Sequence, residues 1–145
     1  MIKYIFTKSE LKTMFYLTGH GDFKCELFDV MTLEQDEFDD AEEGLIAKNV
    51  IFRVNNSDIK VDKMFTSLVD VIAGAEYITG KKPVIVFVGA SKRGGIAIVM
   101  EEDPRNENII KMIPYRNIEE VAEEYGMDIL LPSGDLDKSK GDTNE

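Results

Sequence analysis

The 145-residue sequence has little cysteine, histidine or tryptophan: one, one and none. A single cysteine excludes an intrachain disulfide, and it is typical of a reducing compartment. No apolar run reaches the length needed to cross a bilayer, so we expect no transmembrane segment. Residues 1–10 lack the apolar core and the small-residue cleavage site of a secretory signal, which predicts a cytoplasmic protein.

Basic residues are also few: 17 lysines and arginines stand against 28 aspartates and glutamates, and the formal net charge is -11. The cations are scattered along the sequence. A surface this acidic repels phosphate backbones unless its cations gather on one face. We therefore expect no nucleic-acid partner. The charge indicates solubility, or a partner with a basic or mixed surface.

The residues that could carry catalysis or bind a metal are isolated. His20 lies between two glycines, and only Asp22 and Cys25 stand near it, without the spacing of a known metal site. No local signature of a catalytic nucleophile surrounds Cys25. We interpret His20 as a loop histidine, and a dyad of His20 with Cys25 as the alternative. The sequence predicts a protein that is not an enzyme and that needs neither a metal nor a cofactor.

Acidic residues concentrate in one run, residues 34–43. Clustered carboxylates can bind calcium, but this run lacks the ligand spacing and the turn glycine of an EF-hand loop. The run falls within a predicted helix, which distributes its side chains around the surface. We interpret it as a solvated acidic face.

The first half of the chain predicts a helical unit. Thr7 and Glu10 form a capping box that opens one helix, and a second box at Thr32–Gln35 opens another that runs to about Lys48. A small hairpin follows over residues 50–61. The stretch Asp62–Gly80 then predicts a long helix that is buried on two faces, with Asp62 as its N-cap and Gly80 after its last turn. This order of elements is close to a winged-helix arrangement.

The second half predicts a small antiparallel sheet and a short helix. Val84–Val88, Ile96–Met100 and Ile109–Tyr115 are apolar runs of strand length, and Asn117 caps a helix that Gly126 ends. The predicted fold is therefore α+β: a winged-helix-like lobe over 1–80 packs against a sheet and helix over 81–131. Together they form one domain, 1–131. The residues 132–145 predict a disordered acidic tail.

The glycine-rich segment Gly89–Gly95 joins the first two of these strands. A phosphate-binding loop would need a lysine and a serine or threonine directly after its second glycine, and then a helix. Here a strand follows, which favours a hairpin turn. Ser91, Lys92 and Arg93 stand at its tip, and the two cations would be prominent on an acidic protein. We predict that these three residues contact a partner.

Several segments of the first half resemble a known family. They are the start Phe6–Leu11, the phrase Glu26-Leu-Phe-Asp29, and the helix pattern Ala41-x-x-x-Leu-Ile-x-Lys48 before a short turn and a long apolar helix. Over roughly half of the chain they are similar to the N-terminal part of the EspG/EsaE-type accessory proteins of type VII (ESX) secretion systems. Those proteins are as a rule longer, often with a repeated second half. The resemblance implies a cytosolic, non-enzymatic chaperone or adaptor that binds helical secretion substrates.

Two functional hypotheses follow. The first is a protein-binding chaperone or adaptor of type VII secretion, which could also form a homodimer. The alternative is a winged-helix transcriptional regulator that binds DNA. In that alternative the acidic helix over 34–43 would have to enter the major groove, and the turn of the wing, residues 55–58, carries no basic residue. Both features favour the first hypothesis.

Overall fold

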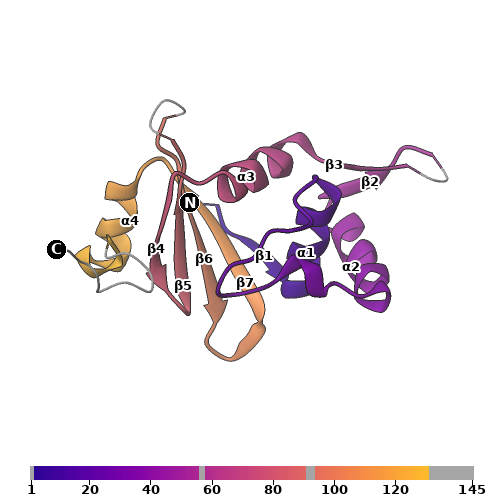
Figure 1. Ribbon diagram of the computed structural model, residues 1–145, viewed down its shortest axis with the longest axis horizontal. Coiled ribbons are helices and arrows are strands. Elements are labelled where there is room, and N and C mark those ends of the chain that lie inside the picture. The colour runs from indigo at the N-terminus through magenta and orange to yellow at the C-terminus, as the bar shows by residue number, and fades with distance from the viewer. Residues whose placement is uncertain (1, 56–57, 91–93, 131–145) are drawn as a thin grey trace.

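The computed structural model describes residues 2–55, 58–90 and 94–130. A five-stranded antiparallel sheet stands at its centre, with helices against both of its faces (Figure 1). The predicted α+β class is therefore confirmed. The predicted tail over 132–145 and the hairpin tip Ser91, Lys92 and Arg93 lie outside the described residues. No helix in the described part of the chain is both long enough and apolar enough to span a bilayer.

The five strands run in the order β1-β7-β6-β5-β4, and every neighbouring pair is antiparallel. Their bounds are β1 Tyr4–Thr7, β4 Tyr77–Lys81, β5 Val84–Val88, β6 Ala97–Asp103 and β7 Asn106–Tyr115. Both edge strands come from residues 1–80, which we assigned to the winged-helix-like lobe. The sheet is therefore not confined to 81–131, and the predicted division near residue 80 falls inside β4.

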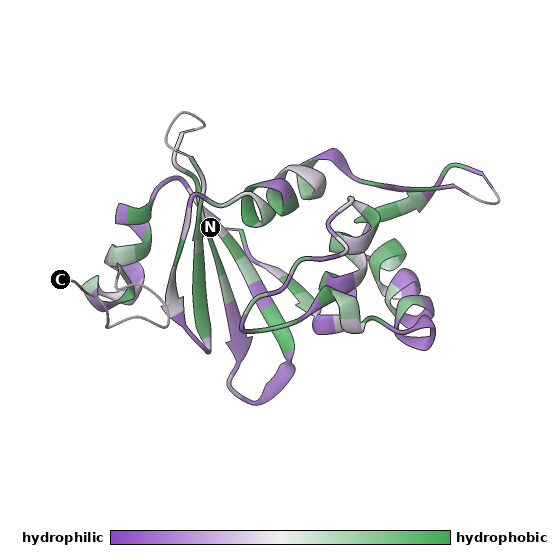
Figure 2. Ribbon diagram, in the orientation of Figure 1, coloured by the Kyte–Doolittle hydropathy of each residue, from purple (hydrophilic) through white to green (hydrophobic). Residues whose placement is uncertain are grey.

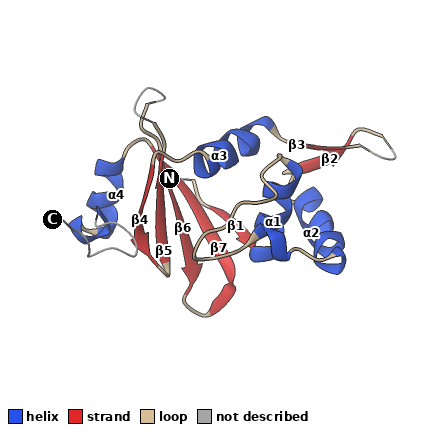
Figure 3. Ribbon diagram, in the orientation of Figure 1, coloured by secondary structure: helices blue, strands red, loops and turns tan. Residues whose placement is uncertain are grey.

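More helices pack on one face of this sheet than on the other (Figure 3). Against one face lie α1 and α3, and α2 packs on α1; the short helix α4 packs on the other face. A separate two-stranded hairpin, β2 with β3, follows α2 as predicted. The bounds of these elements are α1 Lys8–Leu17, α2 Gln35–Ala47, β2 Ile51–Arg53, β3 Ile59–Val61, α3 Lys63–Ala73 and α4 Ile118–Tyr125. The described part of the chain also contains two short 3-10 helices, η1 Val30–Thr32 and η3 Met127–Leu130.

The sheet is apolar on both faces because helices cover both. In β5, Ile85 and Phe87 point toward α1 and α3, whereas Val86 and Val88 point toward α4. A strand buried on both sides has no polar alternation, which explains the continuous run Val84–Val88. Figure 2 shows the apolar strands at the centre and a hydrophilic turn between β6 and β7.

The helix predicted over Asp62–Gly80 is shorter in the structure. Asp62 caps it as expected, its carboxylate accepting the Met64 N–H at 3.0 Å, but α3 ends at Ala73. Residues 77–81 instead form β4, which pairs with β5. The buried side chains of α3 lie along one stripe rather than two: Phe65, Val69 and Ile72. The prediction of burial on two faces is therefore wrong: Met64, which lies off this stripe, is 44% exposed, and Ile78 lies in β4.

The two predicted capping boxes have different outcomes. The box of Thr7 and Glu10 is present, with both reciprocal hydrogen bonds. The second box lies two residues further along than expected, between Glu34 and Glu37. Thr32 does not cap α2, because it lies in η1, two residues before the N-cap Glu34. Its hydroxyl donates to the Asp29 carbonyl at 2.6 Å. The similarity to a winged helix stays a prediction.

Candidate functional site

The main candidate site is an apolar groove of about 390 Å³ between the end of α1, the turn of η1 and the start of α2. We call it the α1–α2 groove. Its lining is largely apolar and aromatic, with one carboxylate and one amide at the rim. The lining residues are Tyr16, Gly21, Val30, Met31, Leu33, Glu34, Gln35 and Phe38.

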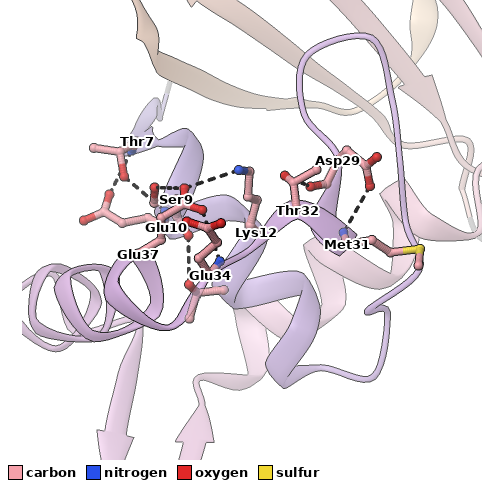
Figure 4. Close-up of polar contacts among 10 residues, drawn as sticks. Thr7, Ser9, Glu10, Lys12, Asp29, Met31, Thr32, Glu34 and Glu37 are labelled. Atoms are coloured by element: carbon pink, nitrogen blue, oxygen red, sulfur yellow. Dashed lines mark hydrogen bonds and ion pairs between the residues drawn. The ribbon is translucent and has the colours of Figure 1, made fainter.

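Local interactions place the floor of this groove. α1 ends at Leu17, and Gly19 then takes a positive φ of 89°, which turns the chain back. The returning loop is anchored by Phe23, whose ring stacks on Phe15 with centroids 4.7 Å apart. Asp29 caps η1 by accepting the Met31 N–H at 3.0 Å (Figure 4). These contacts fix the turn that carries Met31.

Large apolar side chains are exposed at the groove. Met31 is 75% exposed and Tyr16 is 56% exposed, and the Tyr16 ring meets Phe38 edge-to-face at 6.1 Å. Exposed apolar side chains that gather around a hollow mark interaction surfaces, whereas scattered ones are ordinary. Methionine suits such a surface because its flexible, polarisable side chain adapts to different partners.

The rim of the groove is acidic. Glu34 lines the groove, and Gln35 beside it donates to Asp39 at 2.9 Å. The outer face of α2 carries further exposed carboxylates, which confirms that the acidic run lies on the surface. These are Asp36, Asp39, Asp40 and Glu43. An apolar hollow with this rim complements an apolar segment that also carries lysine or arginine.

One carboxylate, Glu37, holds the two helices of the groove together (Figure 4). Its Oε2 accepts from the Ser9 hydroxyl at 2.8 Å and from Lys12 Nζ at 3.3 Å, and its Oε1 accepts the Glu34 N–H at 3.2 Å. Partial burial disfavours the ionised form, but these hydrogen bonds outweigh it. Together they hold the pKa of Glu37 below its usual range.

The lowered pKa of Glu37 predicts that the α1–α2 contact weakens in acid. The unfolded side chain has a pKa of 4.5, and the folded value lies below it. The unfolded chain therefore binds the proton first, so the stabilisation is present above pH 4.5 and is lost as the pH falls through the folded pKa. We expect Glu37→Gln to show a smaller fall in Tm than the wild type when both are acidified. Glu43→Gln, at an exposed carboxylate of the same helix, is the control and should keep the wild-type slope; an unchanged slope for Glu37→Gln would contradict the assignment.

The residues singled out from the sequence lie elsewhere. The base of the hairpin that carries Ser91, Lys92 and Arg93 is formed as predicted, with the Gly89 N–H donating to the Ile96 carbonyl at 2.8 Å. The tip itself is outside the described residues, so its role in partner binding stays a prediction.

His20 and Cys25 have separate structural surroundings. His20 Nε2 lies 3.0 Å from Asp70 Oδ1, which joins the loop after α1 to α3. Cys25 is largely enclosed, and burial raises the pKa of its thiol. A raised pKa keeps the thiol protonated and a weak nucleophile near neutral pH. Within the described residues, no group of three or more histidine, cysteine or acidic side chains is placed to hold a metal ion.

Two other carboxylates are buried, and each is paired with lysine. Glu10 accepts from Lys48 Nζ at 2.6 Å. Glu102 Oε2 lies 3.0 Å from Lys8 Nζ and 3.8 Å from Lys82 Nζ. The Glu102 contacts are ion pairs without the alignment of hydrogen bonds. Because these charges are compensated within the fold, we assign them a structural role.

A second hollow, of about 460 Å³, lies between the end of α3 and the base of the β5–β6 hairpin. Small residues line much of it, among them Gly74, Gly89 and Ala90. It offers fewer large side chains to a partner than the α1–α2 groove, which is why the groove is the stronger candidate.

Sequence reasoning missed the groove, although two signals for it are present. Tyr16 is an aromatic residue next to the buried stripe of Leu11, Met14 and Phe15, so it has no place in that stripe. The apolar run from Val30 to Leu33 lies in a connection with no helical or strand period. Comparisons of the chain with protein-family models, with curated proteins and with solved structures find no match.

Proposed function

We propose that the protein binds a partner polypeptide in the α1–α2 groove and acts as a non-enzymatic chaperone or adaptor. The observation that carries this proposal is the pair of exposed side chains Tyr16 and Met31 beside one apolar hollow. Exposing both to water is unfavourable in a free domain, and a partner that covers them recovers that free energy. A chaperone for an apolar segment needs such a surface.

The shape and charge of the groove favour an amphipathic helix as the occupant. Helical ligands insert side chains spaced three or four residues apart into a groove of this kind. The volume of about 390 Å³ suits one or two large apolar side chains. Lysine or arginine beside those anchors would meet Glu34 and the carboxylates of α2.

The resemblance to EspG/EsaE-type proteins supports a narrower proposal, in which the partner is a helical substrate or component of type VII secretion. The groove lies within the segment that carries the resemblance, from Phe6 to Ile78. DNA binding finds no comparable support, because α2 presents carboxylates where a recognition helix would need cations.

Met31→Glu is expected to weaken partner binding about tenfold, because it places a charge in the apolar hollow beside Glu34. The matched control is Met127→Glu, the same change at a methionine of η3 that is 69% exposed. The measurement is co-purification of a helical-hairpin type VII substrate co-expressed with each variant, followed by titration calorimetry of the purified pair.

The possible results separate the parts of the proposal. Wild type and Met127→Glu should recover the substrate equally, and Met31→Glu should recover little. Equal recovery by all three would show that another surface binds the partner. Recovery by none would remove the type VII assignment. A shift of random duplex DNA at low salt would favour the regulator instead.

A further inference from the structure

β1 is an edge strand, and its hydrogen bonds reveal which backbone groups face outward. The Ile5 carbonyl accepts from Lys48 Nζ at 3.0 Å, and the Thr7 N–H donates to Glu10 Oε1 at 2.9 Å. Neither group is therefore used by the ladder with β7. Because N–H and C=O groups alternate in direction along a strand, Tyr4 and Phe6 bond to β7 while the odd-numbered residues face away.

Part of this outer edge has no partner. Lys48 holds the Ile5 carbonyl and Glu10 holds the Thr7 N–H, so the end of β1 near α1 is closed. The alternation also turns the Ile5 N–H away from β7. Outside the strand ladders, no hydrogen bond within residues 2–55, 58–90 and 94–130 is made by the Lys3 N–H, the Lys3 carbonyl or the Ile5 N–H. These three groups form a short open stretch that can accept one more strand.

A cleft of about 300 Å³ runs beside this open stretch. Its far wall is apolar: Val50 lines it, and so does Phe65, whose ring meets Tyr4 at 5.0 Å. Two lysines, Lys3 and Lys48, also line it, together with Ile5 and Phe6 of β1. The Lys48 ammonium has three N–H groups and uses two of them, on Ile5 and Glu10.

We propose that this cleft binds the C-terminal residue of an extended peptide. The N–H of that residue donates to the Lys3 carbonyl. Its terminal carboxylate accepts from the Ile5 N–H and from the third N–H of Lys48. Its apolar side chain lies against Val50 and Phe65, and the peptide runs parallel to β1.

Two features favour a chain terminus over other occupants. A strand that continued along β1 would meet the Ile5 carbonyl and the Thr7 N–H, which Lys48 and Glu10 already occupy. A second copy of the edge would bring Lys3 against its equivalent, and like charges repel. A carboxylate instead complements Lys3. Lys48, already paired with Glu10, adds a hydrogen-bond donor rather than an uncompensated charge. This site is distinct from the α1–α2 groove.

The test uses two pools of hexapeptides that end in valine, leucine, isoleucine or phenylalanine: one with free carboxylates and one amidated. Amide resonances of the ¹⁵N-labelled full chain are followed by NMR during titration. The free-acid pool should shift Lys3 and Ile5, and the amidated pool should bind about tenfold more weakly because it lacks the charge.

Ile5→Pro is the sharpest variant, because it removes an outward N–H that the ladder does not use. It should weaken binding about tenfold, read from the Lys3 resonance, whereas the control Ile5→Val should bind as the wild type does. If Ile5→Pro does not fold, Lys3→Glu at an exposed position replaces it and should also weaken binding. The proposal is overturned if the free-acid pool shifts neither residue, if both pools bind equally, or if the folded variant binds as tightly as Ile5→Val.

Discussion

Replacing Phe15 by alanine is expected to lower the free energy of unfolding by about 3–5 kcal/mol, the cost of removing a buried aromatic ring. Phe15 is fully buried on α1. Its ring stacks on Phe23 at 4.7 Å and meets Phe28 edge-to-face at 5.4 Å. The loop that leads to η1 therefore rests on this ring, and the cavity left by alanine would be lined by side chains from two segments.

The control for this prediction is the neighbouring aromatic residue. Tyr16 is 56% exposed, so Tyr16→Ala should change the free energy of unfolding by about 0.5 kcal/mol. Urea denaturation followed by circular dichroism measures both variants. A loss below about 1 kcal/mol for Phe15→Ala would show that the loop does not depend on this ring. If Phe15→Ala remains folded, it should also bind partner less well, because it loosens the turn that carries Met31.

Gly80→Ala is expected to cost about 2–5 kcal/mol, the sum of backbone strain and overpacking. Gly80 lies in β4 with φ of 81°, a conformation that side chains rarely adopt. A Cβ there would also lie 2.5 Å from the Val84 carbonyl oxygen. That oxygen belongs to the β5 backbone, which is paired with β4 and with β6 and cannot move aside.

Gly126→Ala separates the two contributions. Gly126 follows α4 with φ of 94°, but among the described residues no atom beyond its chain neighbours lies within 4 Å of the added Cβ. Strain alone predicts a loss of about 1–2 kcal/mol there. Thermal and urea denaturation of both variants should rank Gly80→Ala as the more damaging. Equal losses of unfolding free energy in the two variants would mean that the β4–β5 connection shifts to make room for the added Cβ at little cost.

Local signals in the sequence predicted the parts of the fold that local chemistry determines. The box of Thr7 and Glu10 and the cap at Asn117 involve residues three positions apart, and both are present. The continuous run Val84–Val88 correctly indicated a strand covered on both faces. The α+β class followed from such elements together.

Other parts depend on contacts between distant residues, and sequence patterns do not reveal these. Tyr77–Lys81 continues the apolar pattern of α3, and only its pairing with β5 makes it a strand. Residues 101–108 are polar and lie outside the predicted strands, yet β6 and β7 extend toward each other almost to Pro104 through their pairing.

The candidate site was harder to predict than the fold. In the loop before α2, Phe28 is buried and Met31 is exposed, although both are large and apolar. The difference arises from how Asp29 turns the chain and from where Phe15 lies, not from any period in the sequence. How much of the β1 edge stays open was equally hard to predict. Lys48 closes the Ile5 carbonyl, and only the folded chain brings these two residues together.

The pairing of β1 with β7 has a consequence for biosynthesis. Met112, the residue opposite Tyr4 in the ladder, leaves the ribosome long after Tyr4 does. Contacts this distant in sequence slow the final closure of a fold. Each nascent chain therefore holds β1 unpaired until β7 has emerged, and the five-stranded sheet can close only after that.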